Sequence, residues 1–284
     1  LGVGILGIGS SGPLIALSTM PIPTLIFWRN LGGALFTAPF ALKHSLDRKG
    51  VKWAIAAGVV LALHFIGFFM AMRMTSVAAG TALVALQPIF AAFFVKISGG
   101  HIPSKAWLGM VVSFIGVLFI SGIDLSLDRR SFLGDIAAII SAALAALYVM
   151  WGSKAQQTLE TTSYTSICYG MCALTSLPIA IIGGYEILHF ASKEWWVLLA
   201  LIGGAQILGH SMFNSALKRV SPAVVSLIVF FEVPVAAVGA KIFNIGNQPS
   251  GFIVPGIILI LVGCAMVVLR TRPEKSAVEA AVNE

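Results

Sequence analysis

The chain has 284 residues, of which 58% are hydrophobic and only 10% are charged, and its mean hydropathy is +0.97. Soluble domains carry roughly 25% charged residues, so a water-soluble fold is excluded. The net charge of +7 at pH 7 does not indicate a nucleic-acid-binding protein, because the Lys and Arg residues stand singly or in short groups between apolar blocks.

These apolar blocks follow one another along almost the whole chain, separated by short polar connections. Roughly 20 helical residues cross the hydrocarbon of a bilayer, so each block predicts a transmembrane helix. Because Leu1 opens directly into apolar sequence, we expect a short native segment to precede it. In chain order, we expect spans near 1–18, 24–42, 52–72, 77–97, 106–122, 133–151, 163–183, 194–215, 222–242 and 251–269.

The charges between the spans predict the orientation. With ten spans both termini share one side, which carries twelve Lys and Arg residues, whereas the opposite side carries five and Arg29 stands inside a span. The positive-inside rule places the richer side in the cytoplasm. We therefore expect a multi-pass protein of the cell inner membrane, with both termini cytoplasmic and a disordered tail at 270–284.

An internal repeat is the strongest pattern in the sequence. The run from Met72, MRMTSVAAGTALVALQPIFAA, aligns with the run from Leu217, LKRVSPAVVSLIVFFEVPVAA, when one residue is inserted before the second proline. Convergence of apolar sequence is the alternative explanation, but the polar and proline matches favour duplication. The matched pairs are Ser76 with Ser221, Gln87 with Glu232, Pro88 with Pro234, Pro39 with Pro178, Gly109 with Gly256, and Gly116 with Gly263.

The repeat predicts how the chain is organised. Each half holds five spans, an odd number, so the two copies insert in opposite orientations and form two five-helix inverted repeats. We expect the first repeat at 1–122, a connecting loop at 123–132 and the second repeat at 133–269, packed as one all-α membrane domain of ten transmembrane helices. Inverted repeats are typical of transporters that work by alternating access around a midplane site.

At these residues the chain resembles the drug/metabolite transporter (DMT) superfamily, and within it the EamA-type ten-helix exporters. The resemblance covers nearly the whole chain: each copy has a span closing at a proline (APF at 38–40, LPI at 177–179), the aligned stretch described above and a last helix with two spaced glycines. Among members it is most similar to the YddG-type exporters of aromatic and neutral amino acids. The first span departs from relatives, because it has Gly9, Ser10 and Ser11 where they have a Trp-Gly opening and a basic residue.

Two aligned polar residues are the first candidates for a site. Glu232 is the one acidic residue deep within a predicted span, where a charge costs about 2.5–3.5 kcal/mol on insertion scales. It either fixes the helix break before Pro234 or accepts a substrate ammonium or a proton in a cavity. Gln87 lies at the same depth and either binds a substrate carboxylate or makes an interhelical hydrogen bond.

The eighth span carries Gln206, His210 and Asn214 at intervals of four, which predicts one polar helical face turned away from lipid. His64 stands in midspan of the third helix, and the residue aligned with His210 is Phe65. These histidines either pack or line the cavity. Zinc is not expected, because no second His or Cys stands at ligand spacing.

Other polar side chains complete the candidates. Arg29 either snorkels to the headgroups or forms part of an outer gate or carboxylate site. Ser10, Tyr148 and Tyr169 add polar or aromatic edges to helices one, six and seven, and each either packs or lines the cavity for an amphipathic solute.

The predicted function is secondary transport, the export of small metabolites and in first place of neutral or aromatic amino acids. The alternatives are a carrier of phosphorylated or nucleotide sugars and an exporter of other small metabolites or drugs. No enzyme is expected, because H-E-x-x-H and G-x-S-x-G are absent, and the missing G-x-x-x-x-G-K-[ST] argues against ATP hydrolysis. We expect no cofactor, a small-molecule substrate, contact with lipid and a monomer.

Overall fold

A computed structural model of the chain describes residues 2–99, 101–121, 128–219, 225, 227–244 and 253–268, and the regular secondary structure in this part is helical. The first half contains α1 (Gly2–Gly9), α2 (Ser11–Leu17), α3 (Ile22–Ala41), α4 (Arg48–Met74), α5 (Val77–Val84), α6 (Gln87–Ile97) and α7 (Ser104–Ser121). The second half contains α8 (Arg129–Ala155), α9 (Thr161–Ile182), α10 (Ser192–Ala200), η1 (Leu201–Ser211), α11 (Met212–Ala216), η2 (Ile228–Phe231), α13 (Glu232–Ile242) and α14 (Ile253–Val268).

Several of these elements continue one another, and the described residues contain the ten helices predicted from the sequence, built as two five-helix inverted repeats. The helices begin and end within about four residues of the expected spans; the expected start of the ninth span and the tail lie outside the described residues. By length and composition, five are each apolar enough to cross a bilayer alone, and they are Arg48–Met74, Val77–Ile97, Arg129–Ala155, Thr161–Ile182 and Ser192–Ala216. Shorter apolar helices cover Gly2–Leu17, Ser104–Phe119 and Val254–Val267.

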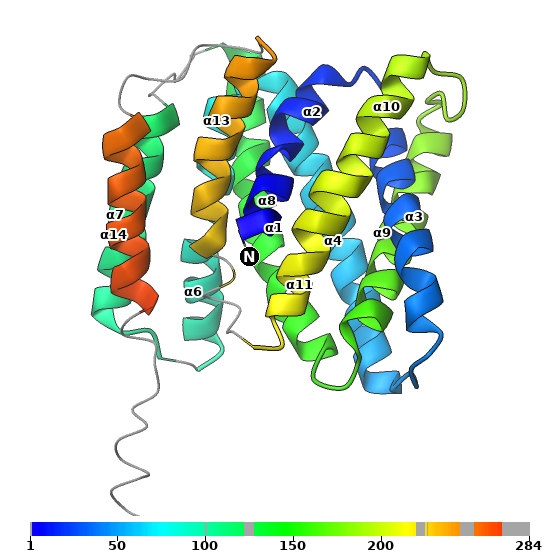
Figure 1. Cartoon of the computed structure of the whole chain (residues 1–284), viewed down its shortest axis with the longest axis horizontal. Helices are drawn as coiled ribbons and strands as arrows, with labels where there is room; N and C mark the ends of the chain where they lie inside the picture. Colours follow the sequence, from blue (N-terminus) through cyan, green and yellow to red (C-terminus); the bar gives the residue numbers. More distant parts are fainter. Residues whose placement is uncertain are drawn as a thin grey trace, which may run out of the picture.

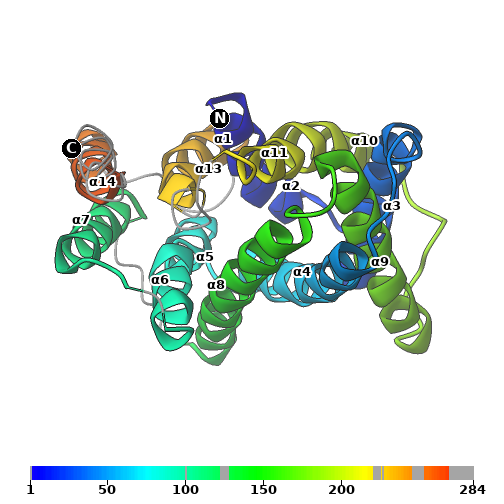
Figure 2. The same ribbon diagram turned by 90° about the horizontal axis from the view of Figure 1, so that it is seen from below.

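The helices stand side by side in two layers (Figures 1 and 2). In the view along the bundle, α14, α13, α1 and α11 form one layer, and α7, α6, α8, α4 and α9 form the other. The paired helices α7 and α14 stand at one end, and α3 packs along α9 at the opposite end. Each layer draws helices from both halves of the chain, so the two repeats interleave rather than forming separate bodies.

Glycines set the distance between α7 and α14. A Cβ added to Gly109 would lie 2.6 Å from the carbonyl oxygen of Gly263, and one added to Gly116 would lie 2.6 Å from that of Gly256. Between these contacts Ser113 donates a hydrogen bond of 3.2 Å to the carbonyl of Ile260. The four glycines of the repeat alignment therefore meet across one antiparallel seam, each facing the glycine of the other aligned pair, which only residues without a side chain permit.

Both repeats interrupt a helix at the same place. In the fourth span α5 ends at Val84 and α6 begins at Gln87, followed by Pro88; in the ninth, η2 gives way to α13 at Glu232. Proline cannot donate the backbone hydrogen bond that would continue the preceding turn. The two aligned polar residues thus open the second part of each broken helix, where unsatisfied backbone N–H groups and the helix dipole favour an acceptor or a negative charge.

The eighth span differs from the α-helix that the sequence predicted. Residues Leu201–Ser211 form a π-helix, between α10 and α11. Gly203, Gly204 and Gly209 fall in this stretch, and Ser211 donates a hydrogen bond of 3.2 Å to the carbonyl of Gln206, five residues earlier. Small residues ease the wider turn, and such segments are frequently found at functional sites.

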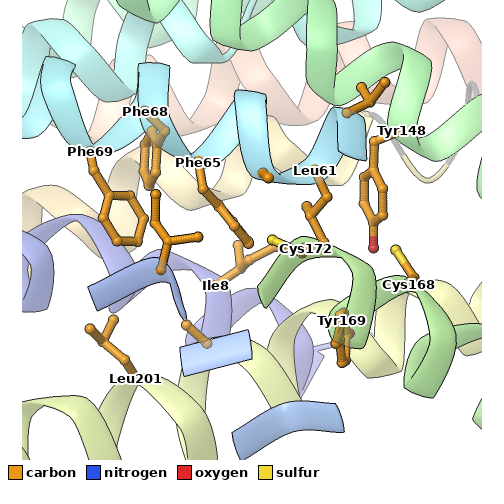
Figure 3. Packing of buried hydrophobic residues seen from close by; sticks show 14 of the residues in the cluster. Ile8, Leu61, Phe65, Phe68, Phe69, Tyr148, Cys168, Tyr169, Cys172 and Leu201 are labelled. Carbon is orange, nitrogen blue, oxygen red and sulfur yellow. The ribbon is translucent and has the colours of Figure 1, made fainter. Parts of the chain in front are cut away.

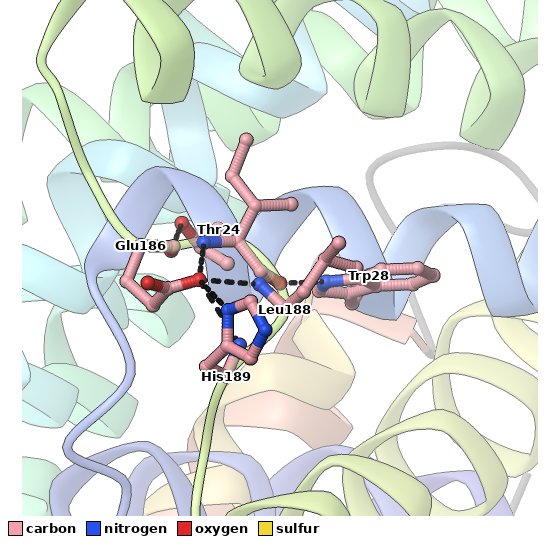
Figure 4. A network of polar contacts seen from close by, with 6 residues as sticks. Thr24, Trp28, Glu186, Leu188 and His189 are labelled. Carbon is pink, nitrogen blue, oxygen red and sulfur yellow. Dashed lines mark hydrogen bonds and ion pairs between the residues drawn. The ribbon is translucent and has the colours of Figure 1, made fainter.

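The connection between α9 and α10 folds back onto α3 (Figure 4). The Glu186 carboxylate accepts hydrogen bonds of 2.9–3.0 Å from the backbone N–H groups of the next three residues, ending at His189. These bonds lower the pKa of Glu186 to about 2. Thr24 donates to the carbonyl of Glu186 at 2.8 Å, and Trp28 donates to that of Ile187 at 2.8 Å. One carboxylate therefore organises the loop that covers this end of α3.

At the predicted cytoplasmic end, Asp47 joins two connections. Its carboxylate caps α4 by accepting from Gly50 N–H at 2.8 Å and also accepts from the Thr158 hydroxyl at 2.9 Å, and the backbone and hydroxyl bonds lower its pKa. Nearby, Lys218 forms an ion pair with Glu160 and lowers the pKa of that carboxyl. These contacts fix the α8–α9 turn to the start of α4 and to the end of the eighth span.

Candidate functional site

A cavity lies between the two layers, and helices of both repeats line it. Its volume of about 40 Å³ is enough for a few water molecules, each of which needs roughly 10–15 Å³ on this scale. A metabolite would need the lining helices to separate. The lining residues are Ile8, Ser11, His64, Phe65, Phe68, Val84, Gln87, Ala145, Tyr148, Val149, His210, Phe213, Asn214, Leu217, Val225 and Glu232.

The cavity lies closer to one side of the bundle than to the other. Leu217 borders both the cavity and a wider polar hollow of about 590 Å³ at the predicted cytoplasmic end, where Gln156 and Lys218 are found. A hollow of about 430 Å³ at the opposite end contains Arg73 and Arg130 and shares no lining residue with the cavity. Among the described residues, Leu217 thus stands between the cavity and the hollow on the predicted cytoplasmic side.

Both residues at the broken helices reach this cavity. Glu232 is buried and lines it from the start of α13, and Gln87 lines it from the start of α6. The carboxylate of Glu232 interacts electrostatically with the buried guanidinium of Arg29. Among the described residues the ion pairs within 4.0 Å involve neither of these two groups, so they act on each other at longer range.

Arg29 is fully buried in α3, so it does not snorkel to the headgroups. Its Nε donates a hydrogen bond of 2.7 Å to the Gln206 side-chain oxygen, and the Gln206 amide donates at 3.0 Å to the Asn30 side-chain oxygen. The guanidinium carbon lies 4.3 Å from the centroid of the Phe65 ring, a cation–π contact. Arg29 therefore lies behind Phe65, which lines the cavity.

A second polar cluster connects the helices on the other side of Phe65. The side-chain amide of Asn214 donates to the Tyr148 hydroxyl at 2.7 Å and to the Tyr169 hydroxyl at 3.4 Å. The Tyr169 and Ser211 hydroxyls are 3.1 Å apart, and Ser211 also bonds to the backbone of Gln206. Hydrogen bonds thus run without interruption from Arg29 to Tyr148. Figure 3 shows Tyr148 with its hydroxyl turned toward the helix that carries Cys168 and Tyr169.

The two histidines have different surroundings. His64 Nδ1 lies 3.0 Å from the carbonyl oxygen and 2.8 Å from the hydroxyl of Ser141 on α8, and its ring stacks on Phe68. His210 meets Phe65 edge to face with ring centroids 5.3 Å apart. Because Phe65 and His210 are aligned positions of the repeat, this contact marks the place where the pseudo-two-fold axis crosses the site.

The structure brings six of the ten candidates to the cavity wall: His64, Gln87, Tyr148, His210, Asn214 and Glu232. Arg29, Gln206 and Tyr169 lie one layer behind it, in the hydrogen-bond chain. Ser10 does not line it, because its hydroxyl donates at 2.7 Å to the Gly7 carbonyl of its own helix; the neighbouring Ser11 lines it instead.

Sequence reasoning missed a polar contact at the end of the bundle opposite the predicted cytoplasmic end. Glu194, buried at the start of α10, accepts hydrogen bonds from the Ser18 hydroxyl at 2.7 Å and from the hydroxyl and backbone of Thr19 at 2.9 and 3.0 Å. Arg73 donates to the Ser18 carbonyl at 3.0 Å. These bonds tie the first, third and eighth spans together. The local sequence did indicate this contact, since Glu194 is an acidic residue in the first turn of an apolar helix.

No group of three or more His, Cys, Asp or Glu side chains that could hold a metal ion is found within the described ranges. The chemistry offered by the site is recognition: one buried carboxylate, one buried guanidinium, amide and hydroxyl groups, and an aromatic wall.

Comparisons with known proteins agree with this architecture. The model of the EamA-like transporter family matches residues 3–122 and again residues 132–269. The pseudopaline exporter of Pseudomonas aeruginosa is 23% identical over 261 residues, which cover 88% of this chain and 87% of the exporter. An uncharacterized transporter of Bacillus subtilis, YyaM, is 25% identical over 230 residues, covering 78% of this chain and 74% of the relative.

One solved crystal structure superposes with a TM-score of 0.74 at 18% sequence identity, covering 95% of this chain and 97% of that one. At this identity the likeness concerns the fold alone.

Proposed function

Since this chain belongs to the EamA-like transporter family, and is therefore a multi-pass membrane transporter, we propose that it exports small zwitterionic metabolites, in first place neutral and aromatic amino acids. The substrate binds in the midplane cavity, and the repeats open it to either side by alternating access. The observation that carries the proposal is the buried carboxylate of Glu232 in the wall of that cavity.

Glu232 suits a substrate with an ammonium group. A carboxylate buried in a membrane protein needs a partner, and a primary ammonium with its three donors supplies one. The aromatic rings of Phe65, Phe68, Tyr148 and Phe213 line the same cavity and offer an apolar wall to a side chain. A neutral or aromatic amino acid combines these two features in one small molecule.

Two observations support export as the direction. The wide polar hollow that shares Leu217 with the cavity lies on the side that the positive-inside rule assigns to the cytoplasm. The Pseudomonas aeruginosa relative is named as an exporter. A substrate would then enter from the cytoplasmic side and leave after the contacts around Glu194 open.

Phosphorylated sugars fit this site less well. A phosphate monoester carries about −1.5 to −2 charges at pH 7 and calls for several cations. Around the cavity the described residues offer Arg29 and two histidines, and the Glu232 carboxylate would repel a dianion.

Purified protein in liposomes tests the proposal. Efflux of labelled phenylalanine, threonine, glutamate and a hexose phosphate is compared between wild type, Glu232→Gln and the control Glu186→Gln, which makes the same chemical change in an exposed loop. We expect phenylalanine and threonine efflux in wild type and the control, and a loss of at least tenfold in Glu232→Gln. Hexose-phosphate efflux without amino-acid efflux would refute the substrate class, and full activity of Glu232→Gln would refute the role of the carboxylate.

A further inference from the structure

The guanidinium of Arg29 is the least satisfied polar group of the buried core. Arg29 has no solvent-exposed surface, and its two terminal nitrogens, Nη1 and Nη2, have no hydrogen-bond partner among the residues that the structure describes. Buried charges in proteins are almost always paired, because a charge that has lost its water without gaining a partner is strongly disfavoured. A cation held in this state in the middle of a membrane domain indicates that an anionic partner binds there during the working cycle.

The side chain is held through its Nε, which leaves the two terminal nitrogens without a hydrogen bond in the described part of the chain. Its Nε is bonded to the Gln206 oxygen, and the Gln206 amide is oriented in turn by Asn30, which donates at 2.9 Å to the Ile26 carbonyl of its own helix. Gly33 leaves the space for Gln206, since a Cβ there would lie 2.8 Å from the Gln206 side chain. Gln206 and Asn30 are thus positioning residues, and Nη1 and Nη2 keep their capacity to donate hydrogen bonds.

Two aromatic rings lie beside the guanidinium. Its central carbon is 4.3 Å from the centroid of the Phe65 ring and 5.8 Å from that of the Phe69 ring. A guanidinium whose two terminal nitrogens are not bonded within the described residues can donate two parallel N–H bonds, as a planar fork, to the two oxygens of a carboxylate.

We propose that Arg29 binds the carboxylate of the transported molecule, while Glu232 binds its ammonium; this assignment rests on the proposed function and names the second half of the same site. Arg29 and Glu232 interact with each other across the core, so the empty site is neutral overall when both are ionised. A zwitterion is also neutral, and it supplies each buried charge with an opposite one. An amine or an acid alone would leave one of the two charges unmatched.

Access to Arg29 depends on Phe65. The ring lies between the guanidinium and the cavity and meets His210 from the other repeat edge to face. The closed cavity is too small for a metabolite, so the separation of the repeats that admits a substrate also parts Phe65 from His210 and opens the way to the fork.

Binding to the purified, full-length protein tests the assignment with three probes of one shape: phenylalanine carries both charges, 3-phenylpropionate only the carboxylate and phenethylamine only the ammonium. Calorimetry compares wild type with Arg29→Gln, Arg29→Lys and the control Arg129→Gln, an exposed arginine at the start of α8. In wild type and the control we expect phenylalanine to bind at least tenfold more tightly than either other probe.

Arg29→Gln should weaken phenylalanine binding to the level of phenethylamine binding. It should not weaken phenethylamine binding itself, because it removes the charge that an amine alone leaves unmatched. Arg29→Lys keeps the charge without the fork and should fall between wild type and Arg29→Gln, which makes it informative even where Arg29→Gln fails to fold. Unchanged phenylalanine affinity in a folded variant, or an equal loss for phenethylamine, would overturn the assignment. One outcome separates the two proposals: wild type transports no amino acid in liposomes, yet it binds 3-phenylpropionate and Arg29→Gln abolishes this binding. In that case Arg29 does bind carboxylates, and the proposed substrate class is wrong.

Discussion

The internal repeat relates α7 to α14 at the end of the bundle, and it also relates the helices around the cavity. Only the α7–α14 pair has the same residue type at the aligned contact positions. Gly109 and Gly116 face Gly263 and Gly256, so each helix offers its partner the same surface. At the centre the aligned positions differ: Phe65 opposes His210, and Gln87 corresponds to Glu232.

The difference follows from what each region does. A packing seam between two copies of one helix needs only matching shapes, and the repeat supplies them directly. A site for a molecule with one positive and one negative end needs two unlike ends itself. On the proposed function, the symmetric periphery supports opening to both sides, and the asymmetric centre recognises the substrate.

The largest effect is expected at the seam. Gly109→Ala should destabilise the protein by about 1–3 kcal/mol, because the new Cβ meets the Gly263 backbone oxygen, which cannot rotate away. Gly170→Ala in α9 is the matched control, since a Cβ there meets nothing within 4 Å. The control should be neutral or more stable by up to about 1 kcal/mol, because alanine favours helix. Thermal unfolding in detergent measures both; equal melting temperatures would show that the seam tolerates side chains.

The second prediction breaks the asymmetry without changing composition. The double variant Gln87→Glu/Glu232→Gln moves the carboxylate to the aligned position in the other repeat. Phenylalanine efflux should fall at least tenfold, equal to about 1.4 kcal/mol, because the carboxylate leaves the place that complements Arg29. Each single substitution is the control for its own half. Wild-type efflux in the double variant, with Glu232→Gln inactive, would mean that the two positions are interchangeable and that the asymmetry has no role in binding.

A smaller effect is expected where α4 packs on α8. Ser141 contacts the ring of His64 and also donates a hydrogen bond of 3.0 Å to its carbonyl. Ser141→Ala should lower the free energy of unfolding by about 1 kcal/mol, since it removes contacts between two helices. Ser176→Ala is the control, because Ser176 bonds only within its own helix, to the Cys172 carbonyl, and should cost less. Equal losses in thermal unfolding would show that the bond to His64 adds nothing beyond local backbone capping.

Much of the fold could be predicted from the sequence, because hydrophobic blocks report span length and the repeat reports orientation. The aligned glycines and the Phe65–His210 correspondence were also readable, since they depend on register alone. The π-helix was not, because it depends on how α1 and α3 pack against Leu201–Ser211, which the sequence pattern does not show. Periodicity likewise could not show that Gln206 turns to Arg29 while Asn214 turns to the tyrosines, or that Arg29 lies behind Phe65 rather than at the headgroups.

The smallest effect is expected for the pH dependence of stability that comes from Glu186, a carboxylate in an exposed loop. Glu186 has a pKa of about 2 in the folded protein, against an ordinary value of 4.5, so its contribution to stability is present above about pH 4.5 and is lost as the pH falls toward 2. Glu186→Gln cannot titrate, so the difference in melting temperature between wild type and this variant should shrink between pH 5 and pH 3. A difference that stays constant would show that the loop over α3 does not depend on this charge. Because the loop lies at the end of the bundle, phenylalanine efflux by Glu186→Gln at pH 7 should equal that of wild type. In Glu232→Gln the same chemical change should abolish efflux, because it removes one end of the proposed substrate site.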